Sequence, residues 1–140
     1  MEDYKIKVQK VINERQLSSV MNNTKWRGLQ SAIKEEFPIT PSFQVKFLLD
    51  DYAHPEDFGE ENWYSGDWEV DLHPFFAVEW IRVNLKVKSS KGLLLETKVT
   101  DYADEFIQLL KRLKIPFVKE DSTILIYGYV RSTDIFRTAD

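Results

Sequence analysis

The sequence predicts an α+β fold in which helices pack on one face of a mostly antiparallel sheet of about four to five strands. Helical spacing and strand alternation follow one another in the order α-α-β, long loop, β-β-α-β. This order lacks the regular alternation that is typical of a parallel sheet. The length of 140 residues fits one domain, 1–140.

Three segments have the apolar spacing of amphipathic helices. The first covers residues 4–20, and the N-terminal region 1–22 is expected to be peripheral. The second begins at Asn23, a good N-cap residue, and ends before Pro38. Asp101 is expected to cap the third helix, which has acidic residues in its first turn, basic residues in its last turn, and Pro116 beyond its end.

Four segments alternate as strands do. They cover residues 42–49, 77–88, 93–99 and 123–131. The turn residues 89–92 predict an antiparallel hairpin between the second and third strands. In the last strand both faces are apolar or aromatic, which predicts a central position in the sheet. Residues 132–140 show no pattern and are expected to form a loosely ordered tail.

The composition excludes several kinds of chemistry. The chain has no cysteine, so a disulfide, a thiolate metal site and a cysteine nucleophile are excluded. The first residues mix charges without an apolar stretch after them, and no run approaches the length of a membrane span. These features predict a cytoplasmic protein that does not enter a membrane.

Residues 50–74, here called the acidic segment, differ sharply from the rest of the chain. They contain nine acidic residues, five aromatic residues and no lysine or arginine. The rest of the chain has 14 acidic residues against all 19 basic ones. One side of the protein is therefore expected to carry a negative field that attracts basic partners and repels nucleic acid.

The acidic segment is also unusually long for a connection. It spans about 25 residues with at most a short strand at 67–72, and loops of this length are either functional or disordered. One interpretation is a binding surface for a basic protein. The other is a lid in which Trp63 and Trp68 fold back over the sheet while the acids solvate the loop. The residues expected to contact a partner are Asp51, Glu56, Asp57, Phe58, Glu60, Glu61, Trp63, Tyr64, Asp67 and Trp68.

Few residues point to catalysis or to a bound cofactor. His54 and His73 are the two histidines, and their spacing from carboxylates matches no metal-site signature. Glu79 is in register with the inward-facing Ile81 and Val83, so a buried carboxylate with a raised pKa is conceivable, although a salt bridge is the favoured interpretation. No nucleophile elbow or phosphate-binding loop is present. We expect no catalytic residue, no metal and no cofactor.

Four short stretches resemble an uncharacterised family of small bacterial proteins. They are 23–29, 63–68, 78–81 and 126–129, with the sequences NTKWRGL, WYSGDW, VEWI and IYGY. The resemblance covers about residues 23–131 and implies a bacterial cytoplasmic domain, without any activity or catalytic residue to transfer. Small acidic bacterial proteins of this kind are similar in class to immunity proteins, which block a toxin by covering its active site.

The leading functional hypothesis is a non-catalytic protein-binding module, of which an immunity-type inhibitor is one example, that engages a basic protein through the acidic segment. The alternative is a small-ligand-binding protein or enzyme with a pocket between the sheet and residues 50–74, near Glu79, His73 and Trp80. The basic stripe of Arg82, Lys86 and Lys88 is interpreted as a solvated sheet face in an acidic protein. Monomer and homodimer both remain open.

Overall fold

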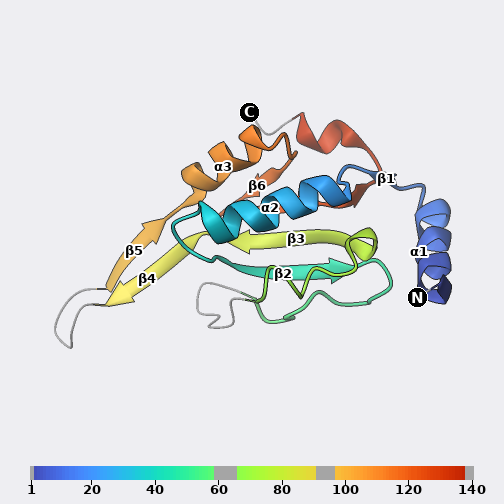
Figure 1. Cartoon of the computed structure of the whole chain (residues 1–140), viewed down its shortest axis with the longest axis horizontal. Helices are drawn as coiled ribbons and strands as arrows, with labels where there is room; N and C mark the ends of the chain where they lie inside the picture. The colour runs from blue at the N-terminus through green and yellow to red at the C-terminus, as the bar shows by residue number, and fades with distance from the viewer. Residues whose placement is uncertain (1, 59–65, 91–96, 138–140) are drawn as a thin grey trace.

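The computed structural model describes residues 2–58, 66–90 and 97–137, and it has an α+β fold (Figure 1). Its centre is a four-stranded antiparallel sheet with the strand order β2-β3-β7-β6. Helices α2 (Asn23–Glu35) and α3 (Ala103–Arg112) lie on one face of this sheet, as the sequence predicted. The strands are β2 (Ser42–Phe47), β3 (Val78–Asn84), β6 (Val118–Glu120) and β7 (Thr123–Tyr127).

The remaining elements surround this centre. Helix α1 (Glu2–Arg15) stands at one end of the sheet and contacts the 3-10 helix η1 (Phe75–Ala77) (Figure 1). Strands β1 (Ser18–Ser19) and β8 (Tyr129–Val130) pair with each other, and so do β4 (Lys86–Ser90) and β5 (Thr97–Asp101). A short 3-10 helix, η2 (Thr133–Phe136), lies in the C-terminal region that showed no sequence pattern.

The main hydrophobic core lies between the sheet and the two helices that cover it. Trp26, Leu29 and Ile33 form the inner face of α2, and Phe106 and Leu110 form that of α3. They pack on the buried residues of β2, β3 and β7. A smaller cluster holds α1 against the segment after β2 and against η1. Burial of these apolar faces supplies the main driving force for the fold.

Both helices begin close to the predicted caps, but each N-cap is one residue away from the predicted position, since the N-cap of α3 is Tyr102 rather than Asp101. The N-cap of α2 is Asn22 rather than the predicted Asn23, and its side chain accepts a hydrogen bond of 2.8 Å from the amide of Lys25. Asp101 accepts a 2.9 Å bond from the amide of Ala103 at the start of α3. Each side chain satisfies an amide that has no partner within its own helix.

The predicted strand 77–88 is interrupted. It forms β3 and β4, and Leu85 between them is fully buried and accepts a hydrogen bond from the amide of Tyr102. The β4–β5 hairpin is antiparallel, as predicted, and projects away from the helices (Figure 1). Val99 on β5 is exposed, since the hairpin projects beyond the helices (Figure 1). Residues 91–96 of the predicted hairpin lie outside the described residues.

The predicted last strand, 123–131, is also interrupted. It divides at Gly128 into β7, which lies between β3 and β6 in the predicted central position, and β8. Strand β6, which the sequence did not predict, pairs with β7 as a hairpin. In the part of the chain that the structure describes, no helix combines the length and the apolar character needed to span a bilayer.

Gly128 occupies a place where a side chain cannot fit. Its amide donates a 2.7 Å hydrogen bond to the carbonyl of Glu79, and a Cβ atom added to it would lie 2.1 Å from the carbonyl oxygen of Val78. In contrast, a Cβ on Gly28 within α2 would lie 3.9 Å from the nearest atom, on Leu113. The two glycines therefore provide a matched pair of sites for the same substitution.

We predict that Gly128→Ala lowers the free energy of unfolding by about 1–3 kcal/mol, because the backbone of β3 must move to admit the methyl group. Gly28→Ala is expected to raise it by about 0.5–1 kcal/mol, because alanine restricts the unfolded chain and favours the helix. Urea denaturation of both variants measures these changes. Equal effects at the two sites would contradict the close approach of Gly128 to β3.

Candidate functional site

The first part of the acidic segment lies along the outer edge of β2. His54 and Val45 exchange two backbone hydrogen bonds of 2.8 and 2.9 Å, which adds an isolated bridge to that strand. The side-chain amide of Gln44 donates a 2.9 Å bond to the carbonyl of Pro55. These contacts cover an edge that would otherwise expose unpaired backbone groups.

The second part of the acidic segment closes the core next to α2. The Asp67 carboxylate accepts hydrogen bonds from the amides of Glu69 and Val70, and the Asp67 amide donates to the carboxylate of Asp71. These local bonds favour a turn. The short strand that the sequence allowed at 67–72 is therefore a turn.

Trp68 anchors this turn in the core. Its side chain is only 4% exposed, its ring lies 4.7 Å from that of Phe43, and its indole nitrogen donates a 2.9 Å bond to the carbonyl of Pro41. Gln30 of α2 donates to the carbonyl of Trp68. Trp68 thus behaves as the lid interpretation predicted, and its buried ring is not available to a partner.

The other residues predicted to contact a partner divide into two groups. Asp51, Glu56, Asp57 and Asp67 are exposed, and Phe58 is partly exposed. Glu60, Glu61, Trp63 and Tyr64 lie outside the described residues. The sequence analysis did not select Tyr52 and Val70, which are each 64% exposed and add apolar surface next to the acids. The acidic residues near Tyr52 in the sequence were the signal that could have identified it as a contact residue.

An apolar cavity of about 320 Å³ lies between β2 and the two parts of the acidic segment. Its walls come from the edge strand on one side and from the segment on the other, and they include one carboxylate. The lining residues are Phe43, Val45, Phe47, His54, Pro55, Gly66 and Asp71. The sequence placed Phe43, Val45 and Phe47 on the core face of their strand but gave no sign that the acidic segment leaves a hollow beside them.

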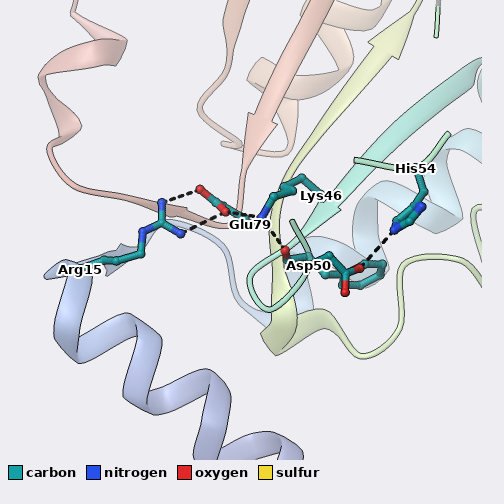
Figure 2. A network of polar contacts seen from close by, with 6 residues as sticks. Arg15, Lys46, Asp50, His54 and Glu79 are labelled. Carbon is teal, nitrogen blue, oxygen red and sulfur yellow. Dashed lines mark hydrogen bonds and ion pairs between the residues drawn. The ribbon is translucent and has the colours of Figure 1, made fainter. Parts of the chain in front are cut away.

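The two histidines lie in different surroundings. His54 pairs with Asp50 at 3.3 Å, at the rim of the apolar cavity, and both side chains are largely exposed (Figure 2). The ring of His73 lies 4.4 Å from the ring of Phe75. Within residues 2–58, 66–90 and 97–137, no group of three or more acidic or histidine side chains has the arrangement of a metal site.

Glu79 lies at a β-bulge in β3. The pairing with β2 shifts at this point, since Lys46 is opposite Trp80 whereas Phe47 is opposite Val78. Glu79 is therefore an extra residue without a partner position on β2. A bulge of this kind interrupts the alternation of side chains between the two faces of a sheet.

The bulge reverses the predicted orientation of Glu79. Val78 and Ile81 are both fully buried, although an uninterrupted strand would place them on opposite faces. The Glu79 carboxylate instead meets two basic groups and is 14% exposed. The register predicted for Glu79 with Ile81 and Val83 does not hold, because simple alternation does not continue through the extra residue. Glu79, His73 and Trp80, which the alternative hypothesis placed near a pocket, do not line the apolar cavity.

Two cations hold Glu79 from different elements (Figure 2). Both guanidinium nitrogens of Arg15, at the end of α1, donate to its two oxygens at 2.8 and 3.2 Å. The ammonium of Lys46 donates to it at 3.2 Å and to the Phe47 carbonyl at 2.8 Å. Burial raises the pKa of Glu79, but the hydrogen bonds and charges of Arg15 and Lys46 outweigh it and lower the pKa below its ordinary value. The carboxylate is ionised at neutral pH, which contradicts a raised-pKa general acid and confirms the salt bridge.

The comparisons with known proteins give a family but no activity. A model with the description "Family of unknown function (DUF6678)" matches residues 8–133. The chain belongs to this family. The DUF6678 match begins in α1, so residues before Asn23, which the resemblance left out, are largely part of the family domain. Neither the search of curated proteins nor the search of solved structures found a match.

For this DUF6678 chain, we predict that Glu79→Gln lowers the free energy of unfolding at neutral pH by about 1–3 kcal/mol, because Arg15 and Lys46 lose a charged acceptor. The pKa of Glu79 is lowered by folding, so its ionic stabilisation is fully present above the unfolded-state pKa, about 4.3, and is lost as the pH falls through the folded-state pKa. The difference between variant and wild type should therefore shrink as the pH falls below about 4.

Urea denaturation across this pH range tests the prediction. Glu14→Gln is the matched control, since Glu14 is exposed and lies 3.9 Å from Lys10. Its effect should stay below about 0.5 kcal/mol at every pH. A Glu79→Gln effect that does not change with pH would contradict an ionic role for this carboxylate.

Proposed function

We propose that the protein is a non-catalytic protein-binding module that engages a basic partner through the acidic segment. The observation that carries this proposal is the apolar cavity of about 320 Å³ that opens within the acidic segment. The exposed acids Asp51 and Glu56 flank the cavity residues His54 and Pro55 in the chain. The same surface therefore offers an apolar hollow and negative charge.

This combination suits recognition of a basic protein segment. Binding energy at interfaces is concentrated in a few side chains that fill well-packed pockets, and aromatic anchors are common among them. We infer that an apolar or aromatic side chain of the partner enters the cavity while neighbouring lysine or arginine residues face the acids. Charges at a rim mainly increase the association rate and select the partner. An immunity-type inhibitor of a basic enzyme would use the surface in this way.

The anchoring of the acidic segment supports the proposal. Backbone bonds between His54 and Val45, the buried ring of Trp68 and the bond from Gln30 tie the segment to the sheet and to α2 at three points. The cavity walls are therefore formed before any partner arrives. A preformed site avoids part of the entropy cost of ordering a loop on binding.

The test is affinity capture from a lysate of cells that make the protein, followed by measurement of binding to the captured partner. Asp51→Lys combined with Glu56→Lys is expected to weaken binding by about tenfold or more, because two attractive rim charges become repulsive. Binding of the wild-type protein should weaken as salt screens these charges, since the Debye length falls from about 10 Å at 0.1 M to about 3 Å at 1 M.

The matched control is Glu14→Lys combined with Glu35→Lys. Both residues are exposed, lie outside the acidic segment, and give the same change in net charge. This control should bind as the wild type does in moderate salt. If both double variants capture the same proteins with equal affinity, or if neither the wild type nor the control captures a basic protein, the proposed function is wrong.

A further inference from the structure

A second cavity, of about 290 Å³, opens on the face of the sheet opposite α2 and α3. Gln44 and Arg82 are paired in register on β2 and β3, and their side chains line this cavity. Their neighbours Phe43, Val45 and Ile81 are buried on the other face of the sheet. The cavity is thus separated from the apolar cavity by β2 itself, and its lining comes from strands β2, β3, β6 and β7, from the turn between β6 and β7, and from Phe58.

The side chain of Asn84 offers hydrogen-bond donors to this cavity. Asn84 is 6% exposed and lines the cavity. Its side-chain oxygen accepts a 3.2 Å bond from the amide of Lys86. The two N–H groups of the same side chain are hydrogen-bond donors. Because Asn84 lines the cavity, these groups can donate to a polar occupant.

The charges of the cavity disfavour an anion. Among the described residues of the lining, Arg82 contributes the one guanidinium, and it already binds Glu120 at 3.1 Å and Thr123 at 3.0 Å. Asp121 adds a second carboxylate to the same lining. A phosphate or carboxylate ligand would face two negative groups and one neutralised cation. Two carboxylates are also too few for a metal site among the described residues.

The remaining groups suit an uncharged ligand that carries several hydroxyl groups. Carboxylate oxygens accept bonds from ligand hydroxyls, the Asn84 amide donates to them, and the side chains of Gln44 and Ser122 offer further partners. The ring of Phe58 adds an apolar surface at the wall. The volume lies near the lower end of small-molecule sites, which span about 300–1,000 Å³.

We propose that this cavity binds an uncharged, polyhydroxylated ligand of monosaccharide size. Hydroxyls of the ligand bond to Asn84, Asp121 and Ser122, and one C–H face of its ring lies against Phe58. The site is independent of the proposed binding of a basic protein, because it lies on the other face of β2 and uses none of the rim acids Asp51 and Glu56.

The test is an NMR titration of the labelled full chain with glucose, galactose, mannose, N-acetylglucosamine and myo-inositol. At least one of these probes should shift the side-chain amide signal of Asn84 and the backbone signal of Ser122, with a Kd on the order of 1 mM. Glucose 6-phosphate and inorganic phosphate should bind more weakly than the neutral probe, because the two carboxylates repel them.

Two variants and a control complete the test. Asn84→Asp retains an acceptor for the Lys86 amide but removes both N–H donors, so the Kd for the neutral probe should rise about tenfold or more. Ser122→Ala, which removes a hydroxyl that makes no hydrogen bond to the residues the structure describes, should raise it about threefold to tenfold. Lys119→Ala is the control on the same hairpin, since Lys119 is exposed and lines neither cavity, and it should leave the Kd unchanged.

Melting temperatures establish that each variant is folded, and Ser122→Ala alone is decisive if Asn84→Asp does not fold. The proposal is overturned if no neutral probe shifts the Asn84 and Ser122 signals. It is also overturned if a phosphate-bearing probe binds more tightly than the neutral ones, or if folded cavity variants bind as well as Lys119→Ala.

Discussion

The bulge at Glu79 is the constraint on which the arrangement of the other elements depends. One extra residue in β3 lets Val78 and Ile81 both enter the core and turns a carboxylate toward basic groups from α1 and β2. The carbonyl of Glu79 also accepts the amide of Gly128, whose own carbonyl accepts the amide of Val20. A single backbone irregularity therefore joins the N-terminal helix, the central sheet and the β1–β8 pair.

The ion pairs at Glu79 contribute more to the orientation of α1 than to the free energy of folding. A largely buried carboxylate loses hydration when the protein folds, and its attraction to Arg15 and Lys46 must first offset that loss. Arg15 is well suited to this role because its planar guanidinium binds both carboxylate oxygens and so sets the angle of α1. The apolar contacts of Val8, Leu48 and Ala77 then stabilise α1 in that orientation.

Sequence patterns predicted the elements that are stabilised mainly by residues close to one another in the chain. The helical spacing of α2 and α3 and the β4–β5 hairpin depend on neighbours within a few residues, and both were predicted from the sequence, whereas each N-cap lies one residue from its predicted position. The bulge at Glu79, the burial of Trp68 and the short strand β6 depend on contacts with distant parts of the chain. Of the candidate site, composition could select the acidic segment, but only the pairing of His54 with Val45 located its first part at the edge of β2.

The alternation of β2 explains how one small sheet can carry two different cavities. Phe43, Val45 and Phe47 meet the acidic segment on one face, whereas Gln44 meets the polar cavity on the other. Pro55 and Phe58, only three positions apart in the same stretch of chain, contribute one wall to each. The bond from Gln44 to the carbonyl of Pro55 joins a residue that lines the polar cavity to a residue that lines the apolar one. The same edge strand therefore positions a wall of each cavity, although the two cavities lie on opposite faces.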